Sequence, residues 1–116
     1  MSAKKTNSLG EMIIADDVIA VLAGISAIES YGIVGMASKR ATDGIVELLG
    51  RENLSKGVRV YTQGDEITID LFIIVEYGIS IAATAENIIE TVKYNVENYT
   101  GMNVKKVNIT VEGVRV

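Results

Sequence analysis

The sequence predicts an α+β domain, a two-layer sandwich in which a small mixed β-sheet is covered by two main helices and one short helix. Two segments between residues 58 and 75 alternate apolar and polar residues around a Gly64-Asp65 turn, as in a β-hairpin. Segments 16–31 and 81–100 repeat apolar residues at helical spacing. With 116 residues, the chain has the length of one domain.

The N-terminal half begins with a mostly polar stretch, so we expect a flexible segment over 1–9 and a single domain over 10–116. A short strand is predicted at 11–15, followed by a helix with Asp16 as its N-cap and Gly32 at its end. Small residues occupy much of the remaining surface of this helix, so another backbone could approach it closely. The helix's predicted apolar face consists of Val18, Val21, Leu22, Ile25 and Ile28.

A strand at 33–36 and a short helix at 43–49, stopped by Gly50, precede the hairpin. After Gly78 a long helix extends to Gly101, and a half-buried strand at 107–111 closes the chain. The apolar stripe of the long helix is predicted to contain Ile81, Ala85, Ile88, Val92, Val96 and Tyr99.

Composition excludes several classes of site. The chain has no Cys, His, Trp or Pro, which rules out a disulfide framework, a Ser-His-Asp triad, a Cys nucleophile and a haem held by His. A zinc site is excluded on the same ground. Eleven basic residues against fifteen acidic ones give a net charge of −4, whereas a domain that neutralises phosphates is usually basic. We therefore expect no cofactor and no nucleic-acid partner.

The stretch from Val18 to Ser38 is long enough to be considered as a membrane span, and Glu29 is its only charge. Three glycines interrupt it, and a carboxylate at mid-segment would cost ~2.5 kcal/mol or more in lipid. The stretch therefore predicts a buried helix, a glycine stop and a short strand. The N-terminus carries no export signal, and the lack of cysteine fits a reducing compartment.

Two carboxylate pairs, Asp16-Asp17 and Asp65-Glu66, are the closest approach to a catalytic or metal-binding group. A helix start and a hairpin turn favour acidic residues for local reasons, and neither pair has a nearby base or further ligands. The GxxG motif at 32–35 matches an RNA-binding loop only in its letters, because its central residues are apolar. No catalytic or metal-binding residue is predicted, and we expect the protein not to be an enzyme.

The second face of the long strand is the more informative feature. Phe72 and Ile74 continue the apolar character of a face that should be polar if helices cover only the other side. One interpretation is that the N-terminal segment or the short helix covers this patch. The other is that Phe72, Ile74 and nearby Tyr77 form a surface for self-association or for a partner.

Several segments together resemble the alkaline shock protein/general stress protein family of Gram-positive bacteria. They cover nearly the whole chain, from about Gly10 to Val116, and their order and spacing carry the resemblance. The matching segments are DDVIA at 16–20, LAGI at 22–25, YGIVGM at 31–36, IDLFIIVEYG at 69–78, AENI at 85–88, VK at 92–93 and VNITVEGV at 107–114.

The resemblance implies a non-enzymatic, cytoplasmic protein of the cell-envelope stress response or of envelope homeostasis. Some members of that family self-assemble and are held at the membrane by a separate anchor protein. We therefore expect an interaction or scaffold protein that self-associates and binds a membrane-anchored partner, with no catalytic residues carried over. The alternative hypothesis is a regulatory module that binds a small ligand, since two-layer α+β domains often bind metabolites at sheet edges.

Overall fold

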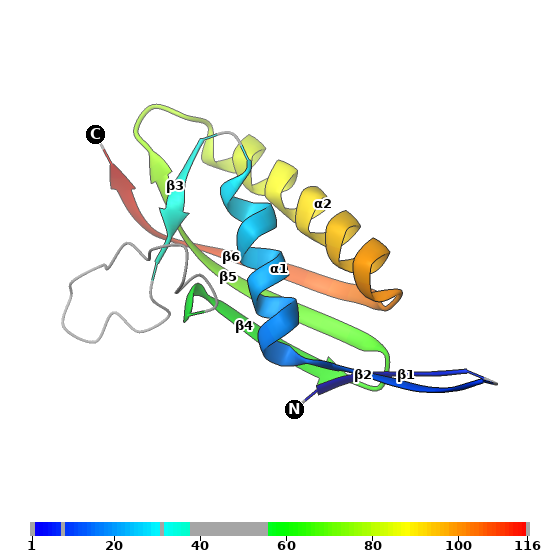
Figure 1. Cartoon of the computed structure of the whole chain (residues 1–116). Coiled ribbons are helices and arrows are strands. Elements are labelled where there is room, and N and C mark those ends of the chain that lie inside the picture. Colours follow the sequence, from blue (N-terminus) through cyan, green and yellow to red (C-terminus); the bar gives the residue numbers. More distant parts are fainter. Residues whose placement is uncertain (1, 8, 31, 38–55, 116) are drawn as a thin grey trace.

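The computed structural model describes residues 2–7, 9–30, 32–37 and 56–115. Over these ranges the chain forms a mixed α+β fold (Figure 1), which confirms the predicted fold class. The predicted short helix at 43–49 lies outside the described residues. In chain order the elements are β1 (Ser2–Asn7), β2 (Gly10–Ala15), α1 (Asp16–Ile28), β3 (Ile33–Met36), β4 (Val58–Gln63), β5 (Glu66–Glu76), α2 (Ile81–Thr100) and β6 (Asn103–Arg115).

Strand β5 is the centre of the main sheet. Along one edge it pairs antiparallel with β4 over its first half and with β3 over its second half. Along the other edge it pairs parallel with β6, so the sheet is mixed, as predicted. The β4–β5 hairpin turns at Gly64-Asp65 as expected, with Gly64 at φ 64°, a left-handed conformation that glycine adopts without strain.

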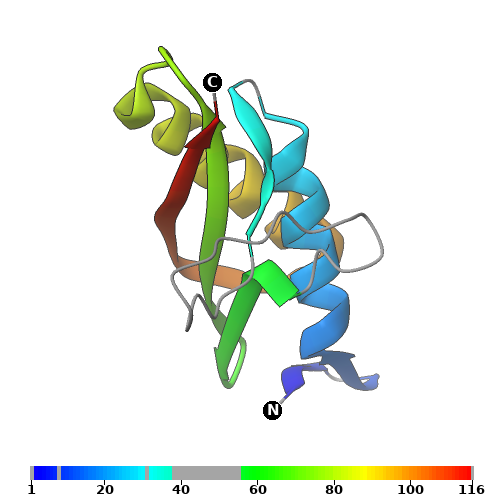
Figure 2. The ribbon, with the colours of Figure 1, turned by 90° about the vertical axis from the view of Figure 1, so that its left-hand side faces the viewer.

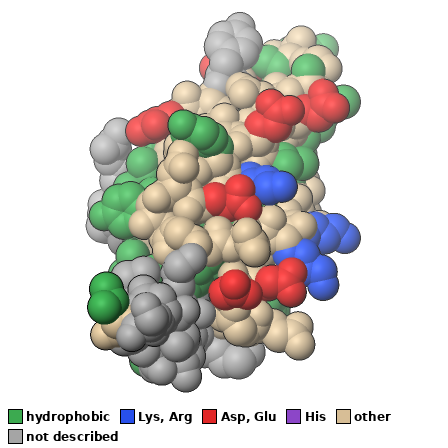
Figure 3. Space-filling model, turned by 90° about the vertical axis from the view of Figure 1, so that its right-hand side faces the viewer, with side chains coloured by type: hydrophobic (Ala, Val, Ile, Leu, Met, Phe, Trp, Pro, Cys, Tyr) green, Lys and Arg blue, Asp and Glu red, His purple; other side chains and the backbone are tan. Residues whose placement is uncertain are grey.

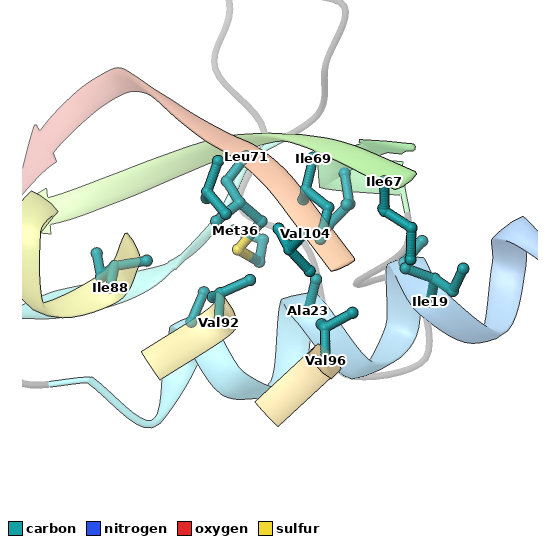
Figure 4. Packing of buried hydrophobic residues seen from close by; sticks show 14 of the residues in the cluster. Ile19, Ala23, Met36, Ile67, Ile69, Leu71, Ile88, Val92, Val96 and Val104 are labelled. Carbon is teal, nitrogen blue, oxygen red and sulfur yellow. The ribbon is translucent and has the colours of Figure 1, made fainter. Parts of the chain in front are cut away.

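The core lies between this sheet and the two helices. Alternate residues of β5, from Ile67 to Val75, point to the helical side, because successive side chains of a strand alternate between faces. Figure 4 shows side chains from α1, α2, β5 and β6 meeting in one cluster, with Met36 of β3 among them. Both helices therefore cover the same face of the sheet.

Helix α2 largely follows the prediction. The side chain of Ser80 caps its N-terminus, accepting a hydrogen bond from the backbone N–H of Ala83 at 3.3 Å. Gly101 ends the helix at φ 72°, as expected. Two residues of the predicted stripe, Ile81 and Tyr99, are exposed instead. The buried row is Thr84, Ile88, Val92, Val96 and Thr100, and the three aliphatic members of this row were predicted.

Helix α1 buries only part of the predicted face, since Leu22 and Ile28 are half-buried against the core. Val18, Val21 and Ile25 are exposed, although they belong to the stripe of larger apolar residues. Small side chains let the helix backbone approach the sheet and α2 closely, and this close approach takes the place of bulky side chains. The buried positions are Ile19, Ala20, Ala23, Gly24, Ser26 and Ala27.

The ends of α1 also differ from the prediction. Ala15, and not Asp16, is the N-cap residue, without a side-chain cap hydrogen bond, and Asp16 and Asp17 lie in the first turn. Their charges are suited to this place, because the N-terminus of a helix favours carboxylates. The helix ends at Ile28, and Gly32 adopts a positive φ of 89° beyond it.

Within the segment expected to be flexible, the described residues 2–7 form a strand. Ser2–Asn7 forms strand β1, which pairs antiparallel with β2 along its whole length. Within the described residues, these two strands make a sheet of their own, separate from the main sheet. Backbone pairing with β2 provides the order that the polar sequence of this segment did not indicate.

Candidate protein-interaction surface

The three residues predicted as an interaction surface do not form one exposed patch. Tyr77 is 73% exposed, whereas Ile74 is only 1% exposed and belongs to the interior. Phe72 is half-buried, and the guanidinium carbon of Arg59 lies 5.7 Å from the centre of its ring. Of the predicted set, the structure therefore offers one fully exposed aromatic side chain at the end of β5.

Irregular strand pairing accompanies the burial of Ile74. It lies between Gly35 of β3 and Gly113 of β6, and the pairing register shifts beside it on both edges. In both irregularities the extra residue lies on the neighbouring strand, so β5 keeps its alternation of faces. Ile73 and Val75 belong to the core cluster and Ile74 does not, although all three side chains are buried. The two-residue period read from the sequence thus assigns Ile74 to the second face, and its side chain is nevertheless buried there.

A row of exposed apolar side chains lies on α1. Val18, Val21 and Ile25 are between 39% and 49% exposed, and they follow one another at helical spacing on the side turned away from the core. Together with Tyr99 of α2, which is 74% exposed, they line a shallow groove. We call this the α1 groove; its lining residues are Asp17, Val18, Val21, Leu22, Ile25 and Tyr99.

The α1 groove is almost entirely apolar. Among the described residues that line it, Asp17 is the only one with a charged side chain. On the face drawn in Figure 3, hydrophobic side chains gather at the left and again at the upper right, and most acidic and basic ones lie over the centre and right. The left of Figure 3 corresponds to the front of Figure 1, where α1 runs. In Figure 2 the front of Figure 1 lies at the right, and α1 is again on that side.

A polar link fixes the position of α1 against α2. Asn95 of α2 donates a hydrogen bond from Nδ2 to Oγ of Ser26 at 3.0 Å. Ser26 in turn donates to the backbone carbonyl of Leu22 at 2.8 Å. Because Ser26 is buried, this chain of hydrogen bonds favours one rotation of α1, the rotation that turns Val21 and Ile25 outward.

The β1–β2 hairpin adds further exposed apolar side chains next to the α1 groove. Ile14 packs against the core, whereas its neighbour Ile13 is 62% exposed and Leu9 at the turn is 96% exposed. Strand β2 ends at Ala15 and continues into α1 without an intervening loop. The first residue that lines the groove, Asp17, follows two positions later, so hairpin and groove adjoin at the β2–α1 junction.

Other features of the described residues are less suited to a functional site. A second hollow lies at the β4–β5 end of the sheet, near Tyr61, Glu66 and Lys105, and it is more polar. No group of three or more carboxylates that could hold a metal ion occurs within the described part of the chain. Neither of the two described helices is long and apolar enough to cross a membrane.

The fold and the α1 groove define a small two-layer α+β domain with an exposed apolar helix face. Residues 4–116 match the sequence profile of the alkaline shock protein 23 family, which is described as having a cell envelope-related function. The chain belongs to this family. The resemblance to alkaline shock and general stress proteins is thereby confirmed.

Two relatives match along the whole chain. The uncharacterized protein YloU of Bacillus subtilis is 47% identical, and the match covers 100% of this chain and 98% of YloU. The uncharacterized protein Spy1614 of Streptococcus pyogenes is 39% identical, with 100% of this chain and 97% of that protein covered.

Among solved structures, the fold is similar to that of the copper form of the MamM CTD. The TM-score is 0.53 at 15% sequence identity, and the match covers 87% of this chain and 88% of that one. At this identity the likeness concerns the fold alone.

Proposed function

We propose that this protein is a non-enzymatic scaffold of the cell envelope that self-associates through the α1 groove. The observation that carries the proposal is the outward stripe of Val18, Val21 and Ile25, which together with Tyr99 forms a nearly uncharged groove on an acidic chain. Contiguous exposed apolar surface of this kind marks a contact site. A second copy is the occupant we infer, since the hairpin beside the groove carries exposed apolar side chains that another copy's groove can cover.

The composition of the groove disfavours the alternative of a small-ligand module. Sites for small polar metabolites combine an apolar lining with several convergent polar groups that fix the ligand's orientation. The α1 groove has one charged group, Asp17, among its lining residues. Its shape and chemistry are better suited to apolar side chains of a protein.

Light scattering coupled to size-exclusion chromatography tests self-association over a concentration series. Val21→Asp places a charge in the groove and is expected to convert the assembly to monomer. Tyr94→Asp is the matched control, because Tyr94 is also an exposed large side chain but lies outside the groove. A native chain that stays monomeric at every concentration, or a folded Val21→Asp variant that still assembles, would contradict the proposal.

We further propose that the scaffold acts in the cytoplasm and is attached to the membrane through an anchored partner protein. The support is the envelope-related family together with the acidic net charge, which disfavours direct binding to anionic lipid. The purified chain is expected to remain in the supernatant with protein-free anionic vesicles, and to sediment with native membranes until these are treated with protease. Sedimentation with bare vesicles would refute attachment through a protein.

A further inference from the structure

We infer that two copies of the chain dock reciprocally, so that the β1–β2 hairpin of each copy lies in the α1 groove of the other. We call the hairpin the arm, and its reciprocal docking arm exchange. This inference rests on the proposed self-association and specifies its geometry. It is carried by three features of the described residues: the separation of the hairpin from the main sheet, its outward apolar side chain at Ile13, and its place beside an apolar groove.

Outside its own strand pairing, the hairpin is supported only in part, by Ile14 and by contacts with α1 and β4. A two-stranded hairpin is marginally stable in water, and stability normally requires a third strand or packing against a helix. β1 and β2 pair only with each other within the described sheets, and Figure 1 shows their turn extending beyond the end of the main sheet. Ile14 connects the hairpin to the core, while its neighbour Ile13 is 62% exposed. A second surface over Ile13 would supply the missing packing.

The α1 groove offers a surface of matching chemistry. Val18, Val21 and Ile25 present aliphatic side chains, and Tyr99 adds an aromatic wall. Burial of an aliphatic side chain such as Ile13 against them is favourable because it removes apolar area from water on both sides.

The position of the hairpin suits a symmetric exchange. Because β2 leads directly into α1, arm and groove lie on either side of the β2–α1 junction. A two-fold axis near this junction would place each arm over the other chain's groove and form the same contacts twice, as in an isologous dimer. Such a dimer is closed, and it buries Ile13 and Val21 of both chains.

Cysteine cross-linking tests the arm exchange cleanly, because the native chain has no cysteine. Ile13→Cys and Val21→Cys variants are purified separately, mixed and oxidised, so that any mixed disulfide joins two chains. The Ile13→Cys variant is labelled uniformly with heavy nitrogen, and intact mass spectrometry then separates mixed from like pairs. Val18→Cys and Ile25→Cys replace Val21→Cys in parallel mixtures, so that no register of the arm is assumed.

We expect Ile13→Cys to form a disulfide with a groove variant about tenfold faster than with Tyr94→Cys, since docking raises the effective concentration of the two thiols. Tyr94 serves as the control because it is exposed and lies outside the groove. Ile13→Asp in the otherwise native chain is expected to abolish assembly, whereas Ile13→Val retains it. If two Val21→Cys chains form a disulfide rapidly while the mixed disulfides form no faster than the control, arm exchange is overturned and self-association still holds. A native chain that is monomeric by light scattering would overturn both.

Discussion

Replacing Ala23 by Leu tests the rotation of α1, on which the groove depends. Ala23 is 0% exposed and lies on the small-residue face that packs into the core. Leucine adds three carbon atoms at this fully enclosed position, and Ala and Leu differ little in helix propensity. Overpacking of this kind costs about 1–3 kcal/mol of folding free energy.

The expected loss can be expressed as a change in melting temperature. Unfolding entropy is about 2.1 cal/mol/K per residue, or about 0.24 kcal/mol/K for this chain of 116 residues. Each kcal/mol therefore corresponds to about 4 °C, and Ala23→Leu should lower the Tm by about 4–12 °C. Val21→Leu is the matched control: Val21 is 42% exposed, and we expect a change within about 2 °C.

Calorimetry or circular dichroism at one low protein concentration measures both variants. Positions 21 and 23 lie about 200° apart around a helix, so they report on opposite faces. A tolerated Ala23→Leu together with a strongly destabilising Val21→Leu would mean that α1 is turned by about half a revolution, and the α1 groove would not exist as described.

Three further substitutions test local features of the fold, each by urea or thermal unfolding. Gly64→Ala should lower the free energy of unfolding by about 1–2 kcal/mol because of the left-handed φ alone, since a Cβ at this position meets nothing within 4 Å. Gly64→Asn should lower it less. Equal stability of the Ala variant and the native chain would contradict the turn. Thr100→Val should lower the free energy of unfolding by about 1–3 kcal/mol, since the buried Thr100 hydroxyl accepts a hydrogen bond from the Met102 N–H at 3.1 Å. An unchanged unfolding midpoint would argue against this hydrogen bond. Gly57→Ala should cost about 1–3 kcal/mol, because its Cβ would lie 2.6 Å from the carbonyl oxygen of Ala37; a neutral result would show that the two backbones are further apart.

The elements that the sequence predicted well are those with strong local periodicity. The β4–β5 hairpin follows from alternation on both sides of Gly64-Asp65, and α2 follows from apolar residues at helical spacing between Ser80 and Gly101. In each case the turn or cap residue and the hydrophobic period agree, and both depend only on neighbours along the chain.

The candidate site was predicted less well. Phe72, Ile74 and Tyr77 were chosen because helices on one face would leave the second face of β5 exposed, but Ile74 is only 1% exposed although it stands outside the core cluster. In the sequence of α1, the small residues on one side are the feature that could have indicated which face of the helix is exposed. The small residues on this side are buried, and with them turned inward several larger side chains on the other side are left exposed.

The sequence by itself determined the fold class, the family and most element boundaries, because these depend on local conformational preference and on the period of apolar residues. Only the tertiary structure decided which face of α1 is buried, how β6 extends along β5 in parallel, and that β1 pairs with β2. The physical reason is that these choices depend on how closely segments distant in sequence can approach. On α1, Ala23 at the contact permits that approach, and Val21 is consequently left on the surface.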